Sequence, residues 1–78
     1  MDKEEMNSRV NEILSLVPRG PKGSPQNEFR VFLNRHARRV WSKNPSAPVK
    51  RILMEAIEWA KKEHPNFVPS YDPELFFH

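Results

Sequence analysis

Residues 24–63 read SPQNEFRVFLNRHARRVWSKNPSAPVKRILMEAIEWAKKE, and this stretch decides the fold. Apolar residues recur every three or four positions on both sides of a short break, as they do in amphipathic helices. The break, residues 44–48, holds two prolines, and a proline inside a helix removes a backbone hydrogen bond. We therefore expect a helical hairpin with helices over 25–43 and 47–63. Its expected core residues are Phe29, Phe32, Leu33, Val40, Ile52, Leu53, Ala56, Ile57 and Trp59.

The beginnings of both helices carry capping signals. Ser24 is a favoured N-cap residue, and Pro25 suits the first helical position that follows it. Ser46 can cap the second helix in the same way, with Pro48 tolerated in its first turn. Trp41 lies about one position outside the apolar stripe, so the pattern leaves its environment open.

On the N-terminal side of the hairpin, residues 1–17 predict an amphipathic helix over 3–17 that Pro18 ends. A helix of this length is marginal in water by itself, so it needs a partner surface. That surface is either the hairpin or another chain, which includes a homodimer. Residues 18–24 form a basic linker rich in Pro and Gly.

On the C-terminal side, residues 64–78 place four aromatic residues among three prolines. We expect an extended tail that packs its rings on the hairpin core, residues 25–63. The alternative is a linear motif for a protein partner, with Leu75–Phe77 as its anchor. The predicted fold class is all-α, a small three-helix domain with an extended C-terminal tail and no sheet.

Several function classes lack their sequence features. The 78 residues include no Cys, and the three histidines are too scattered for a zinc site. No paired carboxylates, Ser/His/Asp set or Gly-rich phosphate loop is visible, so we expect neither an enzyme nor a cofactor. No apolar run approaches the ~18 residues of a membrane span. The acidic start lacks a secretory signal, which predicts an intracellular protein, nuclear if eukaryotic or viral.

Positive charge is concentrated in the middle of the chain. Residues 18–54 hold nine of the thirteen Lys and Arg residues and one acid, Glu28, which gives this stretch a charge of +8 against +3 for the whole chain. Arginines at intervals of four form a broad helix face, and such a face is typical of phosphate binding. The candidate nucleic-acid-binding residues from this pattern are Lys22, Arg30, Asn34, Arg35, Arg38, Arg39, Lys43, Lys50 and Arg51.

Residues 21–60 also resemble an HMG box, and the likeness rests on aromatic positions and an Asn-Pro turn. The matching residues are Pro21-Lys22, Phe29, Val31-Phe32, Val40-Trp41-Ser42-Lys43-Asn44-Pro45 and Glu58-Trp59. The plant YABBY domain, itself HMG-like, is similar in Trp59-Ala60 and His64-Pro65-Asn66-Phe67.

The resemblance implies minor-groove DNA binding, and it adds Val49, at the second wedge position, to the candidate site. HMG boxes bend DNA with apolar wedges, but the first wedge position here is Arg30. The long third helix of the family is absent, and the Trp spacing is one residue short. We therefore expect no strong bending.

Two functions follow as expectations. The first is a small DNA-binding protein that contacts the phosphate backbone or minor groove with little sequence specificity; RNA is a second possible nucleic acid. The alternative is a protein-interaction adaptor or inhibitor. It would use residues 1–17 and Leu75–Phe77 against an acidic partner.

Overall fold

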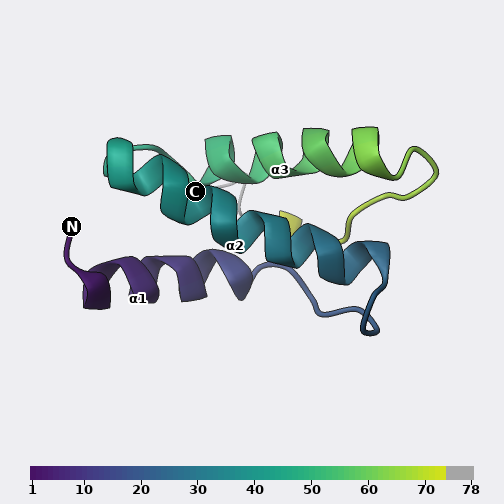
Figure 1. Ribbon diagram of the computed structural model, residues 1–78, viewed down its shortest axis with the longest axis horizontal. Coiled ribbons are helices and arrows are strands. Elements are labelled where there is room, and N and C mark those ends of the chain that lie inside the picture. The colour runs from purple at the N-terminus through teal and green to yellow at the C-terminus, as the bar shows by residue number, and fades with distance from the viewer. Residues whose placement is uncertain (74–78) are drawn as a thin grey trace.

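The computed structural model describes residues 1–73, and this range contains three helices and no strand. They are α1 (Lys3–Leu14), α2 (Pro25–Lys43) and α3 (Val49–Glu63). Successive helices run in opposite directions, with α2 between α1 and α3 (Figure 1). The predicted all-α, three-helix fold is confirmed. The expected Leu75–Phe77 anchor lies outside the described residues.

Capping explains where two helices begin. Ser24 Oγ accepts a hydrogen bond from Asn27 N at 3.3 Å, and α2 begins at Pro25 as predicted. Asp2 plays the same role for α1, since its Oδ1 accepts from Glu5 N at 2.8 Å. These bonds satisfy backbone donors that the first turn of a helix leaves without partners.

Two predicted boundaries are wrong. The helix α1 ends at Leu14 rather than at residue 17, because Leu16 N and Val17 N turn back to Ile13 O and Leu14 O in a tighter final turn. The helix α3 begins at Val49 rather than at residue 47. The residue before a proline is kept out of the α region, and Ala47 precedes Pro48.

Ser46 is consequently not the N-cap of α3, although the sequence pattern predicts that it is. Its backbone N–H donates to Asn44 Oδ1 at 3.2 Å, so the Asn44 side chain organises the turn instead. Pro48 occupies the N-cap position and supplies no side-chain hydrogen bond.

The core lies where the inner faces of all three helices meet. Six of the nine predicted core residues are buried, whereas Phe32, Val40 and Trp59 are only partly buried at its edge. Trp41, which the sequence pattern leaves open, is fully buried. The apolar arc of α2 is displaced towards Trp41 because α1 covers that side of the helix. The buried core residues are Val10, Ile13, Val17, Phe29, Leu33, Ala37, Trp41, Ala47, Ile52, Leu53, Ala56, Ile57 and Ala60.

The amphipathic N-terminal helix packs on its own chain. Val10 and Ile13 of α1 are 0% exposed, and Val17 just beyond it is 2% exposed. Of the two partner surfaces considered for residues 1–17, the hairpin of the same chain is therefore the one that α1 covers.

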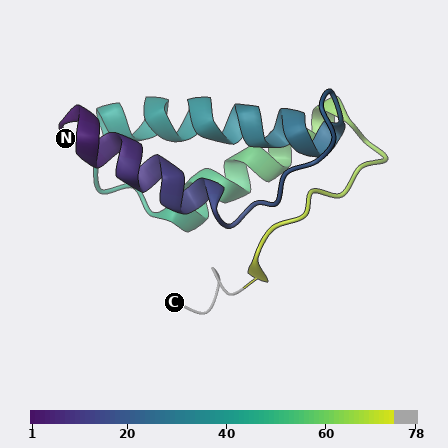
Figure 2. The same cartoon turned by 90° about the horizontal axis from the view of Figure 1, so that it is seen from below.

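Residues 64–73 return beneath the helices, on the side of the bundle away from α2 (Figure 2). Phe67 and Tyr71 are partly buried against the core. The Gln26 carboxamide fixes the path of this segment: its Oε1 accepts from Ser70 N at 2.9 Å, and its Nε2 donates to Ser70 O at 3.0 Å. Nε2 also lies 3.0 Å from Pro18 O, so one side chain joins α2 to both the linker and the tail.

Candidate nucleic-acid interface

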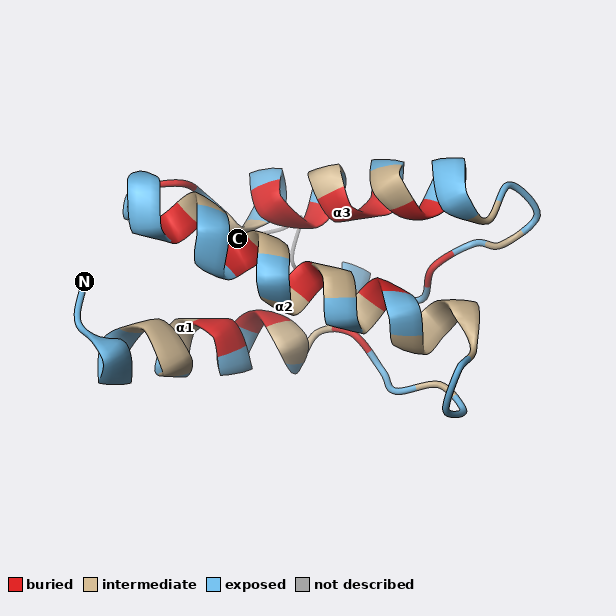
Figure 3. Cartoon of the chain, viewed as in Figure 1, coloured by how far each residue is buried: buried red, intermediate tan, exposed pale blue. Residues whose placement is uncertain are grey.

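The side of α2 that faces away from α1 and α3 is exposed along the length of the helix (Figure 3). Arg35, Arg39 and Lys43 are exposed there and follow one another at intervals of one helical turn. None of these three side chains has a hydrogen-bond or ion-pair partner among residues 1–73. We call Arg35, Arg39 and Lys43 the outer basic row; it presents three positive charges directly to solvent.

This charge arrangement opposes the stability of the helix. Like charges separated by four residues destabilise a helix by a few tenths of a kcal/mol per pair. The outer basic row contains two such pairs, Arg35 with Arg39 and Arg39 with Lys43. An anion bound across the row would relieve the repulsion.

A second group of cations follows the α2–α3 turn, which begins after Lys43. Lys50 and Arg51 are exposed in the first turn of α3, which contains no acidic residue. Cations at a helix N-terminus meet the positive end of the helix dipole, so their position is also unfavourable. Arg51 is partly compensated, because its Nε lies 3.6 Å from Glu55 Oε1.

Arg30 is used inside the protein. Its Nε donates to Val17 O at 2.8 Å and its Nη2 to Leu14 O at 3.2 Å. These carbonyls lie in the last turn of α1 and just beyond it, where a helix ends and its backbone acceptors run short of donors. Burial, and then the positive charge of Arg19, lower the pKa of Arg30. Its guanidinium is therefore a cap for α1.

Arg38 and Asn34 also face α1. Arg38 Nε donates to Asn34 Oδ1, and Arg38 Nη1 donates to Asn7 Oδ1, both at 2.9 Å. The two predicted site residues therefore form part of a bridge between α2 and α1. We call Arg30, Asn34 and Arg38 the inner polar row.

The remaining two predicted site residues, Val49 and Lys22, lie at opposite ends of α2. Val49 is half-buried and packs against the core, so its side chain is held by the fold. Lys22 is exposed in the linker, which lies at the other end of α2 from the α2–α3 turn (Figure 1). The structure thus gathers Arg35, Arg39 and Lys43 in one row, places Lys50 and Arg51 across the α2–α3 turn from it, and leaves Lys22 apart.

Arg9 is an arginine whose role the charge pattern does not indicate. Its Nη1 donates to Pro45 O at 2.7 Å, and its Cζ lies 4.4 Å from the centre of the Trp41 ring. Trp41 Nε1 in turn donates to Ala47 O at 2.9 Å. These contacts fix the α2–α3 turn, and with it the neighbouring cations, against α1. Arg9 lies outside the basic stretch, so only its helical position beside Val10 hints at a packing role.

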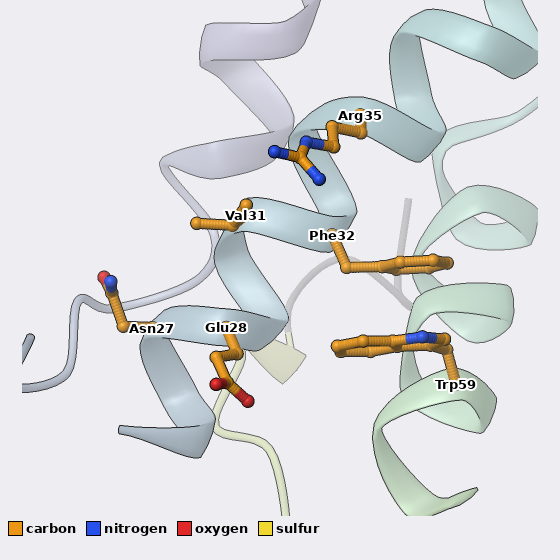
Figure 4. A pocket seen from close by; sticks show the side chains of 6 residues that line it. All are labelled: Asn27, Glu28, Val31, Phe32, Arg35 and Trp59. Carbon is orange, nitrogen blue, oxygen red and sulfur yellow. The ribbon is translucent and has the colours of Figure 1, made fainter. Parts of the chain in front are cut away.

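An aromatic hollow lies between α2 and α3, beside the outer basic row (Figure 4). It has a volume of about 340 Å³. The Phe32 and Trp59 rings stack with centroids 4.3 Å apart and planes 2° apart, and His36 stacks on Phe32 at 5.3 Å. The sequence pattern assigns Phe32 and Trp59 to the core, so it gives no indication of this hollow. The lining residues are Asn27, Glu28, Val31, Phe32, Arg35 and Trp59.

Residues 1–73 lack two other features. This part of the chain brings together no group of three His, Cys, Asp or Glu side chains that could hold a metal ion. None of its helices is long and apolar enough to cross a membrane. No protein-family model, curated protein or solved structure matches the chain.

Proposed function

We propose that the protein binds duplex DNA through the outer basic row and the adjoining cations Lys50 and Arg51. The observation that carries this proposal is the exposed row Arg35, Arg39 and Lys43, which has no partner within residues 1–73. Repulsion within this row supports an anionic partner, since an anion would remove that cost.

The spacing of the row suits a polyanion. Eight residues separate Arg35 from Lys43, so the row extends for about 12 Å at the rise of an α-helix. A duplex of that length carries about seven phosphates, because DNA has about one charge per 1.7 Å of its axis. Several phosphates can therefore be contacted at once without distortion of the helix.

The proposed binding has little sequence specificity and does not bend DNA strongly. Contacts to phosphate carry little direct information about the bases. The part of the chain that resembles an HMG box comprises α2, the turn and most of α3. Its two wedge positions offer no apolar side chain for insertion, because Arg30 caps α1 and Val49 packs against the core.

The alternative function, a protein adaptor, has less support from α1. Val10 and Ile13 of α1 are buried within the fold and Met6 and Leu14 are partly buried, so little of the apolar stripe of α1 is left for a partner. An acidic protein that binds the outer basic row is the alternative outcome of the test below.

The test is a fluorescence-anisotropy titration of labelled duplex DNA at about 50 and about 200 mM salt, the range in which phosphate contacts lose affinity. The double variant Arg35→Ala, Arg39→Ala should bind more weakly and remain folded. Each lost phosphate contact should reduce the magnitude of the slope of log K against log salt by about 0.9. The loss should be similar on unrelated sequences.

A matched control removes the same charge elsewhere. Lys61 and Lys62 are exposed in the last turn of α3, outside the outer basic row. The double variant Lys61→Ala, Lys62→Ala should keep most of the affinity and the salt slope. Equal losses in the two double variants would show a general effect of net charge, and absence of wild-type binding at low salt would refute the proposal.

A further inference from the structure

The aromatic hollow combines an apolar wall with polar groups at both ends. Its apolar lining consists of the stacked rings of Phe32 and Trp59 and of Val31, which is 45% exposed and precedes Phe32 on α2. Arg35 lies at one end, and Asn27 and Glu28 lie at the other (Figure 4). A ligand that fits must therefore have an apolar body, an anionic group for Arg35 and hydrogen-bonding groups for the opposite end.

The polar end of the hollow is suited to hydrogen-bond donors. Glu28 Oε2 lies 2.6 Å from His64 Nε2, which holds the carboxylate in place at the rim. A carboxylate has about four lone-pair positions, so Glu28 can accept from a ligand as well. The Asn27 amide offers both donors and an acceptor.

We infer that the hollow binds an unpaired nucleobase, with Arg35 on the adjoining phosphate, so that the protein prefers DNA ends or bulges with unpaired bases over fully paired DNA. The inference rests on the proposed DNA binding and adds a second, base-contacting site to it. The flat base would lie against Val31 and the ring pair. Its amino group would donate to Glu28, as the cytosine amino group does to acidic side chains elsewhere.

Two other occupants fit less well. A cationic side chain would match the rings and Glu28 but would meet the charge of Arg35. An acidic peptide with an apolar side chain would match Arg35 but would bring carboxylates next to Glu28. A paired base stays stacked inside the duplex and cannot enter, so only an unpaired base satisfies both ends.

The preference is measured with one labelled duplex in two forms, blunt and with a three-nucleotide overhang. Contact between a base and an aromatic side chain is worth enough to change affinity about tenfold. We expect a Kd about tenfold lower for an overhang of cytosines or adenines. An overhang of thymines should gain less, because thymine has no exocyclic amino group. Overhang binding should also quench Trp59 fluorescence, and Trp59→Phe should lose this signal.

Variants of Trp59 and Val31, which line the hollow, distinguish base binding in the hollow from duplex binding by the outer basic row. Trp59→Ala should bring the blunt-to-overhang ratio of Kd close to one. Val31→Gln, at a more exposed position, should lower the same ratio with less risk to folding. Met54→Gln is the matched control, because Met54 is 42% exposed and lies outside the hollow. It should keep both affinities.

Each outcome decides the inference. If the wild type binds blunt and overhanging DNA equally, in a salt-dependent way, the inference is wrong and the proposed duplex binding stands. A preference that survives in both wall variants also overturns the inference. Binding of neither DNA refutes both proposals. Quenching of Trp59 by a Glu- and Phe-containing peptide, without quenching by overhangs, would assign the hollow to a protein partner instead.

Discussion

The four arginines of α2 belong to two groups that differ in what surrounds them. Arg30 and Arg38 face α1 and donate hydrogen bonds to it, whereas Arg35 and Arg39 face solvent and have no partner among residues 1–73. The same residue type therefore holds the fold together on one side of a helix and remains available for a ligand on the other. Charge density alone does not separate the two roles; the positions of the acceptors on α1 do.

From this difference we expect the contacts between α1 and α2 to contribute much of the free energy of unfolding. Deletion of residues 1–17 removes three fully buried aliphatic side chains, each worth about 1.5–3 kcal/mol, and the acceptors of Arg30. The sum is comparable to the whole stability of a small domain. We expect the truncated chain to lose its cooperative unfolding transition, as followed by circular dichroism. A truncated chain that still melts cooperatively near the wild-type temperature would show that contacts with α1 contribute little to stability.

The next largest effect is expected for Trp41→Ala. The ring is 0% exposed, lies under Arg9 and donates to Ala47 O. Removal of a buried aromatic ring costs about 3–5 kcal/mol. Urea unfolding should show this loss, and a smaller one for Trp59→Ala, whose ring is only partly buried. The reverse order would contradict the burial of the two rings.

A smaller loss of stability is expected for Arg30→Met, because Val17 O loses its Arg30 donor and Leu14 O keeps only the bond from Val17 N. Loss of hydrogen bonds from a charged group costs about 1–3 kcal/mol, and partial exposure places Arg30 near the lower figure. Arg35→Met, the control on the solvent side, should change the free energy of unfolding by less than about 0.5 kcal/mol. Equal values in urea titrations would remove the distinction between the groups.

The smallest expected effect distinguishes neighbouring arginines in DNA binding. Arg39→Ala should reduce the magnitude of the slope of log K against log salt by about 0.9, the value for one phosphate contact. Arg38→Ala should reduce it less, because its guanidinium already donates to Asn7 and Asn34. The two single variants have the same net charge, so anisotropy titrations compare them directly. A larger loss for Arg38→Ala would mean that the bridge to α1 opens when DNA binds.

The helices were predictable wherever local chemistry sets their limits. Ser24 and Pro25 define the start of α2, and the Asn44-Pro45 pair defines its end. The start of α3 was missed because the restriction on Ala47 by Pro48 outweighs the capping tendency of Ser46.

The core and the site were less predictable because they depend on tertiary contacts. The prediction of a hairpin assumes that α2 packs against one helix. In the structure α2 packs against two helices, so Trp41 is buried and Phe32 lies at the edge of the core. The capping role of Arg30 depends on where Leu14 O lies, which no pattern within α2 records.

The Gln26 carboxamide has a consequence for the tail, because it bonds Ser70 as a main-chain peptide group would. It accepts from Ser70 N and donates to Ser70 O, so it stands in for one residue of a paired strand. The amide proton of Ser70 is therefore protected by a side chain rather than by secondary structure. Its hydrogen-exchange rate reports the release of the tail separately from the unfolding of the helices. A carboxylate at this position would keep the acceptor and lose the donor. Only an amide lets this side chain both accept from Ser70 N and donate to Ser70 O.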